Sequence, residues 1–443
     1  MVDNTTVFSS VLVFSSPLRS PSEAEQKSSS LLLFSTSRRA SSESFAMAGI
    51  CCDLPKEMLE EVLSWLPPQS LIQFKCVSKS WYALIDSLMK NPEFVNKHLR
   101  NIDNKLLSST CLVFFCVSYT YSRRRHRNSI PLRHKVFKSV TICHDDRESD
   151  HTNNVVEDFH MPTLPGEVDP VNELRGHCNG IICLARYNKI ILCNPAIKEW
   201  RSLPKPCLDS GSFEALGVGF GYDSRANDYK VVRFGLDRFL PDRIEYFKAR
   251  AELYSLRSDS WREIEIHLEL DTFPHLGKEV FNRGVFYWFL WTHNVIFSFN
   301  VLYEVFHSIP LPNNLRVVQE DHFIRLGVWN ESVALFFYSN KRGSPNSIEV
   351  WVMEDCFVGA QDSCPWTKKL VIGPLADVAI PLTFLKNDEL LLQRTDGGLI
   401  LYDLHSQMLR NFTIIQGVNS IPCWDFSYVK SLVSVQGGSP SHS

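Results

Sequence analysis

The 443-residue chain lacks any apolar run long enough to cross a bilayer and any marked excess of charge of one sign. Its apolar stretches, such as 111–117 and 285–291, have only the length of a strand, which argues against a membrane-spanning helix. The formal net charge of −3 gives no electrostatic reason to expect nucleic acid or an anionic membrane as the main partner. We therefore expect no nucleic-acid partner and no membrane partner.

Signatures of catalysis and of metal binding are missing as well. The sequence contains no GxSxG, HExxH or GxGxxG pattern, and these patterns mark hydrolases, metalloproteases and dinucleotide-binding proteins. Thirteen cysteines are scattered without a CxxC pair, which predicts free thiols in a reducing compartment. We expect a non-catalytic protein without metal or cofactor, located in the cytoplasm and, as a second location, in the nucleus.

Residues 54–99 have the pattern of short helices. Apolar residues recur at helical spacing up to Pro67-Pro68, which ends the first run. A second helix is expected from its cap Ser70, and a third from about Lys79 to Leu88. Three short helices are too few to support an independent core. We therefore predict that this helical module forms one half of a protein–protein interface.

Beyond residue 105, short β-rich runs separated by Gly, Pro, Asn and Asp replace the helical pattern. Five copies recur of a strand, a polar turn and a second strand with an aromatic or apolar anchor; their first strands cover 190–194, 251–256, 295–300, 348–353 and 399–403. Spacings of roughly 45 to 60 residues have the scale of kelch or WD blades. We predict an α+β multidomain chain whose C-terminal part is an all-β, kelch-like β-propeller of five blades, or of six with a further copy across 111–165. An irregular β-sandwich is the alternative.

Two parts of the chain resemble known families. The run from Leu54-Pro55 through Leu66-Pro67 to Ser80-Trp81 resembles an F-box. The β-rich part is similar to the plant F-box-associated interaction domain on residues 176–184, 194–200, 219–223 and 228–233. Within that group the chain looks most like the S-locus F-box proteins. The resemblance implies a three-helix F-box over 47–100 and an F-box-associated, substrate-binding β domain over 105–435.

The resemblance implies the substrate-recognition subunit of a Skp–cullin–F-box E3 ubiquitin ligase. In such a subunit the F-box binds a Skp-type adaptor, and through it a cullin and a RING subunit, while the β domain holds a protein substrate. By tethering the substrate within the ligase, the subunit raises the effective concentration of the substrate for ubiquitin transfer, and it performs no covalent step itself. For the S-locus group the implied substrate is a style ribonuclease (S-RNase) of self-incompatibility. The alternatives are an F-box scaffold outside a ligase and, from a different class, an enzyme with its site in the propeller channel.

Carried over position by position, the resemblance assigns eight residues to the adaptor-binding surface. They are Leu54, Pro55, Leu63, Pro67, Leu71, Cys76, Val77 and Trp81. For each of them, packing inside the helices is the competing interpretation. That packing role is the one we expect for Val62, Leu66 and Phe74.

The sequence offers two weaker groups of candidates for a substrate-binding surface. They are the aromatic residues Phe239, Tyr246 and Phe247 and the acidic residues Asp145, Asp146 and Asp150. Aromatic side chains on loops are common recognition anchors, and an acidic stretch would steer a basic substrate such as an S-RNase. The alternatives are packing of the aromatic residues onto the β domain and simple solvation of the acidic ones.

Both ends of the chain differ from the rest. Residues 1–46 are rich in Ser and poor in acids. We expect a disordered extension, or an upstream start with Met47 as the true initiator, and an organelle transit peptide is the alternative. Residues 436–443 are expected to be a disordered tail. The basic run 123–127 is interpreted as a solvated loop, with a nuclear-localisation or nucleic-acid patch as the alternative.

Overall fold

The computed structural model describes residues 55–105, 109–120, 132–143, 155–159, 173–186, 188–208, 213–237, 247–270, 274–277, 279–312, 315, 322–339, 345–354, 366–385, 388–396, 398–411 and 424–436. The chain divides into two units, and the described residues of the first are 55–63, whereas those of the second lie within 64–436. The expectations for residues 1–46, for the basic run 123–127 and for the last seven residues therefore lie outside the described part.

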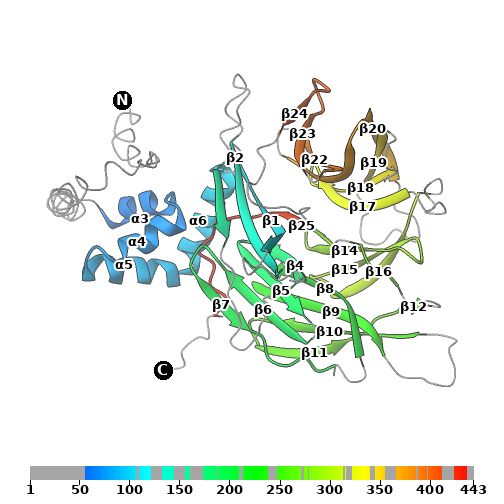
Figure 1. The fold of residues 1–443 in the computed structure, drawn as a ribbon. Coiled ribbons are helices and arrows are strands. Elements are labelled where there is room, and N and C mark those ends of the chain that lie inside the picture. The colour runs from blue at the N-terminus through cyan, green and yellow to red at the C-terminus, as the bar shows by residue number, and fades with distance from the viewer. Residues whose placement is uncertain are drawn as a thin grey trace, which may run out of the picture. The chain divides into compact units, whose positions relative to one another are not determined.

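Four helices lie within residues 55–105, one more than predicted (Figure 1). They are α3 (Lys56–Ser64), α4 (Pro68–Phe74), α5 (Lys79–Lys90) and α6 (Pro92–Lys105). Pro68 occupies the first turn of α4, where its missing N–H costs no helical hydrogen bond. Ser70 therefore lies inside the helix and does not cap it, contrary to our prediction. Ser78 caps α5 by accepting a hydrogen bond from the Trp81 N–H, 3.2 Å away.

The described strands form six antiparallel sheets, numbered here I to VI. Sheet I contains β25 (Trp424–Ser427), β1 (Ser109–Thr120), β2 (Leu132–Cys143) and β3 (Val155–Phe159). Sheet II contains β4 (Glu173–Cys178), β5 (Ile181–Arg186), β6 (Lys189–Asn194) and β7 (Glu199–Ser202). Sheet III contains β8 (Phe213–Asp223), β9 (Asp228–Asp237), β10 (Phe247–Ser255) and β11 (Ser260–Ile264), with β12 (Glu269–Leu270) paired to β10.

The remaining three sheets follow the same meander of four consecutive strands. Sheet IV contains β13 (Val280–Asn282), β14 (Val285–Leu290), β15 (Val295–Asn300) and β16 (Val305–Pro310). Sheet V contains β17 (His322–Trp329), β18 (Ser332–Ser339), β19 (Asn346–Met353) and β20 (Trp366–Leu375). Sheet VI contains β21 (Val378–Phe384), β22 (Glu389–Arg394), β23 (Leu399–Asp403) and β24 (Leu409–Asn411). The five copies predicted from the sequence are the last two strands of sheets II to VI.

Hydrophobic clusters join the six sheets in a cycle. Each cluster spans one pair of neighbours: I with II, II with III, III with IV, IV with V, V with VI, and VI with I. Between sheets III and IV, the rings of Phe234 and Trp288 meet edge to face with centroids 4.9 Å apart. Leu112 of sheet I packs with Leu391 and Leu401 of sheet VI and closes the cycle. The predicted β-propeller is therefore confirmed, and a sandwich, which packs two sheets on each other, does not fit.

Among the described residues, one polar turn recurs five times between consecutive strands. In each, an Asn, Asp or Ser side chain accepts a hydrogen bond from a backbone N–H two or three residues on, and the residue four positions on has a positive φ. The pairs are Asn194 and Lys198 (φ 56°), Asp223 and Asn227 (50°), Ser255 and Asp259 (51°), Asn300 and Glu304 (57°), and Asp403 and Gln407 (57°). Short polar side chains that bond to nearby backbone favour such turns. This local chemistry explains the polar turn in four of the five sequence copies, and the turn at Asp223 joins β8 to β9 outside them.

The C-terminal segment closes the ring. β25 pairs with β1, and residues 428–436 then reach sheet II (Figure 1). There the Asn194 Nδ2 donates to the carbonyl oxygens of Ser431 (3.1 Å) and Val433 (2.8 Å). Gly180 has a φ of +82°, and a Cβ at this position would lie 2.3 Å from the Ser431 Oγ. Asn194 and Gly180 therefore anchor the C-terminal segment to sheet II.

Candidate functional site

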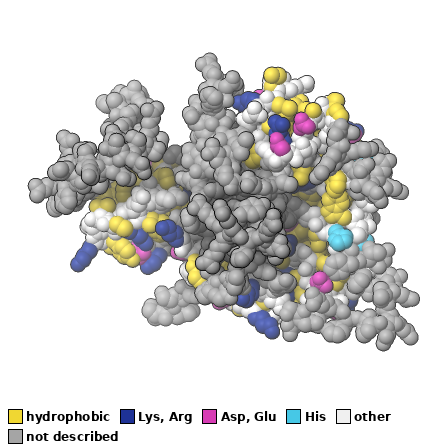
Figure 2. Space-filling view, viewed as in Figure 1, with side chains coloured by type: hydrophobic (Ala, Val, Ile, Leu, Met, Phe, Trp, Pro, Cys, Tyr) yellow, Lys and Arg dark blue, Asp and Glu magenta, His cyan; other side chains and the backbone are white. Residues whose placement is uncertain are grey.

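Helix α3 carries apolar side chains that reach the surface. Met58 is 57% exposed and Val62 is 38% exposed, and Pro55, just before the helix, is exposed too. Val62 was expected to pack inside the helices, so that expectation is wrong. Figure 2 shows hydrophobic side chains at the surface over the helical part of the chain. An amphipathic helix that leaves large apolar side chains in water is typical of a protein-binding surface.

A second exposed apolar group lies at the junction of α4 and α5. Cys76 and Val77 are exposed, and Tyr82 is 54% exposed. The Lys75 Nζ lies 5.2 Å from the centroid of the Tyr82 ring and 2.9 Å from the Asp86 Oδ1. Protein interfaces have an apolar core and a polar rim. The exposed apolar side chains here correspond to such a core, and Lys75, held by Asp86, corresponds to the rim.

The eight residues assigned to the adaptor surface do not share one environment. Leu63 and Leu71 are buried, with 1% and 0% exposure, and a partner cannot contact them unless the helices rearrange. Trp81 is half-buried, and its ring lies 5.2 Å from that of Phe74. Leu54 lies outside the described residues. The assigned residues that reach the surface are Pro55, Pro67, Cys76 and Val77.

Helix α6, which was not predicted, holds the connection between α3 and α4. His98 is fully buried, and its Nε2 lies 2.9 Å from the Leu66 carbonyl oxygen. Burial lowers the pKa of His98, so the ring is neutral and its Nε2 donates, since a carbonyl oxygen only accepts. The Asn101 Nδ2 donates to the Ser64 Oγ at 2.8 Å. These two bonds fix the backbone that presents Pro67.

Comparison with known proteins agrees with the division into helical and β parts. A family profile described as "F-box domain" matches residues 51–92, and one described as "F-box associated beta propeller domain" matches residues 130–435. The chain belongs to the F-box associated β-propeller family. It is similar to an F-box/kelch-repeat protein of Arabidopsis thaliana, with 25% identity over 395 residues that cover 86% of this chain and 96% of the relative. It is also similar to an F-box/LRR-repeat/kelch-repeat protein of the same plant, with 23% identity over 404 residues that cover 86% and 98% of the two chains.

In the F-box associated propeller, the motif Asp228–Arg233 connects neighbouring elements. Asp228 accepts hydrogen bonds from the Ser255 Oγ at 2.5 Å and from the Arg257 N–H at 2.9 Å, which fixes the turn between β10 and β11. The Tyr229 hydroxyl accepts a hydrogen bond from the Asn179 Nδ2 at 3.1 Å. These contacts give the motif a structural role.

The last residue of this motif forms a buried ion pair. The Arg233 Nε lies 2.6 Å from the Glu252 Oε1, and both side chains have 0% exposure. The Arg233 Nη2 donates to the Leu208 carbonyl oxygen at 2.7 Å, and the Glu252 Oε2 accepts from the Leu208 N–H at 2.9 Å. Burial raises the pKa of Glu252 and lowers that of Arg233. The pair therefore stabilises the connection between β7 and β8 at a cost in desolvation.

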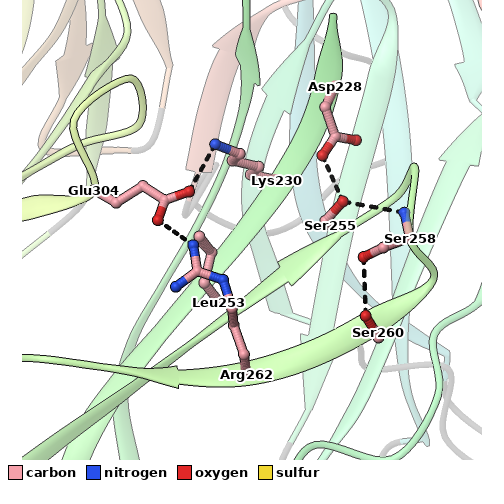
Figure 3. Close-up of a pocket in the computed structure, with 8 residues that line it drawn as sticks. All are labelled: Asp228, Lys230, Leu253, Ser255, Ser258, Ser260, Arg262 and Glu304. Atoms are coloured by element: carbon pink, nitrogen blue, oxygen red, sulfur yellow. Dashed lines mark hydrogen bonds and ion pairs between the residues drawn. The ribbon is translucent and has the colours of Figure 1, made fainter. Parts of the chain in front are cut away.

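A polar pocket of about 240 Å³ lies where sheet III meets the turn between β15 and β16 (Figure 3). Lys230 and Arg262 converge on Glu304 on one side, buried Leu253 lies between, and Asp228 and three serines line the other side. The Lys230 Nζ lies 2.8 Å from the Glu304 Oε1. Burial opposes ionisation of Glu304, but hydrogen bonds from Lys230 and Arg262 outweigh it and lower the pKa. Glu304 is therefore a carboxylate that joins sheet IV to sheet III.

The predicted substrate-binding residues are not brought together by the described structure. Phe239, Tyr246, Asp145, Asp146 and Asp150 lie outside the described residues. Phe247 is the first residue of β10, and its backbone pairs with Leu270 of β12. The pocket residues were missed because they come from different turns, and no local motif links Arg262 with Glu304.

The described residues also bear on metal and thiol chemistry. Among them, no group of three or more His, Cys, Asp or Glu side chains is placed to hold a metal ion. Burial raises the pKa of Cys178 and of Cys193 to about 12, and it raises that of Cys183 further. These thiols are therefore protonated and unreactive. In the same described part, no helix is both long and apolar enough to cross a bilayer.

Proposed function

We propose that this F-box protein is the substrate-recognition subunit of a Skp–cullin–F-box E3 ubiquitin ligase. The observation that carries the proposal is the pairing, in one chain, of an F-box with exposed apolar side chains and a closed β-propeller. The F-box would bind a Skp-type adaptor, and through it a cullin and a RING subunit. The propeller would hold a protein substrate for ubiquitylation, and the chain itself would perform no covalent step.

The adaptor-binding surface in this proposal consists of the exposed F-box positions, with Pro55, Pro67, Cys76 and Val77 making direct contact. Leu63 and Leu71 are buried and Trp81 is half-buried, so the proposal gives these three residues no direct contact. Leu54 enters the proposal from its place beside Pro55 in the sequence motif. The proposed location is the cytoplasm, with the nucleus as a second location.

The substrate is a separate part of the proposal. The resemblance to S-locus F-box proteins favours a style S-RNase, and it is the one sequence feature that does so. The acidic residues at 145–150 and the aromatic residues at 239–247 are the positions proposed to meet such a substrate.

Co-purification tests the ligase role. We expect the full chain, expressed with a plant Skp-type adaptor, cullin and RING subunit, to recover all three. The double substitution Leu54→Ala and Pro55→Ala should abolish recovery of the adaptor, because a central apolar anchor often costs about 2 kcal/mol or more when truncated. The thermal midpoint of the propeller should stay unchanged. Full recovery of the adaptor by this variant would contradict the assigned surface.

The same experiment separates the ligase from the scaffold alternative. Recovery of the adaptor without the cullin would indicate an F-box scaffold outside a ligase. Recovery of neither would contradict the F-box assignment. Mass spectrometry of proteins captured from reproductive and vegetative plant tissue would then test the S-RNase.

A further inference from the structure

The acceptor groups of the polar pocket between sheets III and IV are already used. Both carboxylate oxygens of Asp228 accept hydrogen bonds, one from the Ser255 Oγ and one from the Arg257 N–H. Both oxygens of Glu304 accept from the two cations beside them. The Ser255 Oγ itself accepts from the Ser258 N–H at 3.2 Å. Each carboxylate oxygen that faces the pocket therefore already has a hydrogen-bond donor within the chain.

Donor groups, in contrast, remain available. Arg262 is 56% exposed, and it directs one nitrogen, Nη2, to Glu304. A guanidinium has five N–H donors in a planar fork, so the others can reach a ligand. The hydroxyls of Ser258 and Ser260 share one hydrogen bond of 2.9 Å, which leaves one hydroxyl proton for a further acceptor. Donors therefore remain on both sides of the pocket, from Arg262 on one side and from Ser258 and Ser260 on the other (Figure 3).

The surroundings of the pocket add cations and an exposed aromatic ring. Arg225 and Arg257 are exposed on the two turns of sheet III nearest to it. Tyr303, in the turn that also carries Glu304, is 48% exposed. The Arg225 Nη2 donates to the Tyr303 hydroxyl at 2.9 Å, and its guanidinium lies 4.6 Å from the ring centroid. Tyr and Arg, together with Trp, are the residues enriched among binding hot spots.

We propose that this pocket binds an anionic side chain, a carboxylate or a phosphomonoester, in an acidic segment of a substrate protein. Arg262 donates to the anion in bidentate fashion, the free hydroxyl of Ser258 or Ser260 completes its coordination, and Tyr303 packs against the neighbouring part of the segment. A volume of about 240 Å³ suits one side chain and is smaller than the usual pocket for a drug-sized ligand. The inference rests on the proposed function, since it names the chemistry of the substrate that the propeller would hold.

Peptide binding to the full chain, purified with its Skp-type adaptor, tests this inference. The probes are fluorescein-labelled hexaglutamate, a Gly-Ser hexapeptide with one phosphoserine, and hexaglutamine, each followed by fluorescence anisotropy. We expect at least one anionic probe to bind and hexaglutamine not to bind. Arg262→Gln should weaken binding at least about tenfold, and Arg262→Lys, which keeps the charge but loses the planar fork, should weaken it less.

Arg283→Gln is the matched control. Arg283 is 55% exposed and lies 2.5 Å from Glu331, so it is a similarly exposed arginine in an ion pair that does not line the pocket. Its substitution removes the same charge, and binding should stay within about twofold, because distant exposed charges are screened by salt. Equal weakening by both substitutions, or no preference for an anionic probe over hexaglutamine, would overturn the inference.

The two anionic probes distinguish the source of the anion, since a carboxylate site binds hexaglutamate and a phosphate site binds only the phosphopeptide. Adaptor recovery is a separate readout. If the adaptor is retained but neither anionic probe binds, the pocket inference fails and the ligase role stands. If no adaptor is recovered, the ligase role fails, and the titrations are made on the full chain alone. Binding of an anionic probe there leaves the pocket inference standing.

Discussion

The F-box and the propeller differ in how far their apolar side chains are buried. In β6 of the propeller, the residues from Ile190 to Cys193 are all buried, because each sheet packs against a neighbour on both faces. In the F-box, Met58 and Val77 remain about half exposed. A closed ring covers its own sheets, whereas four short helices leave apolar surface that a partner can cover. We infer that substitutions in the propeller act mainly on stability and that substitutions on the F-box surface act mainly on binding.

The largest loss of stability is expected from breaking the buried pair in the propeller. Arg233→Met leaves the Glu252 carboxylate buried without its partner, which should lower the free energy of unfolding by about 3–5 kcal/mol. Urea unfolding followed by tryptophan fluorescence measures this change. Arg250→Met is the control: Arg250 pairs with Glu263 on the neighbouring strand, but these side chains are 29% and 51% exposed. That substitution should cost about 1 kcal/mol or less.

A double variant sharpens this prediction. Replacing Glu252 by Leu in the Arg233→Met background removes the uncompensated charge, so part of the lost stability should return. The recovery is partial because the backbone groups of Leu208 lose their partners. A double variant no more stable than the single one would show that the buried charge is not the cause.

A smaller loss is expected from opening the ring closure. Asn194→Ala removes the hydrogen bonds to the buried carbonyl oxygens of Ser431 and Val433, which should cost about 2–3 kcal/mol. Asp403→Ala, at the same position of the recurring turn, loses only bonds within its turn and should cost about 1 kcal/mol. Unfolding midpoints in urea measure both. Equal costs would argue against a role of Asn194 in closure.

The smallest expected effect is a pH dependence of the F-box. Burial places the folded-state pKa of His98 below its ordinary value of about 6.5, so the unfolded chain binds more protons below that pH. The stability from neutral His98 is therefore present above about pH 6.5 and decreases as the pH falls through this value. Hydrogen exchange of α4 and α6 at pH 7.5 and 5.5 measures the change. His98→Gln keeps a hydrogen-bond donor but does not titrate, so it should reduce the difference in protection of α4 and α6 between the two pH values. An unchanged difference in this variant would contradict the assignment of the pH dependence to His98.

The sequence predicted the repeated part of the propeller well, because its signals are local. Strand periodicity and the polar turn lie within each copy, as in Ile190–Asn194 and its turn. Sheet I could not be predicted in full, since Trp424 of β25 pairs with Phe115 of β1 across about three hundred residues, and no local signal marks that partner. Helix α6 was missed because its role depends on distant contacts, such as His98 with Leu66.

The candidate sites were harder to predict for the same reason. Leu71 and Val77 are both apolar positions of the F-box motif, yet packing buries the first and exposes the second. Likewise, Lys230, Arg262 and Glu304 meet only because sheets III and IV are neighbours. Their pocket favours an acidic ligand segment, whereas the acidic run at 145–150 would suit a basic one. Those two surfaces therefore predict different substrates.

The comparison between the F-box and the propeller is tested most directly by the affinity for the Skp-type adaptor. Calorimetry on two matched variants measures this affinity. Val77 of the F-box and Val371 of β20 in the propeller are both exposed valines, at 46% and 60%. We predict that Val77→Glu weakens adaptor binding by about tenfold or more and that Val371→Glu leaves it within about twofold, with both chains folded. Unchanged binding by Val77→Glu, or an equal loss in both variants, would contradict the account.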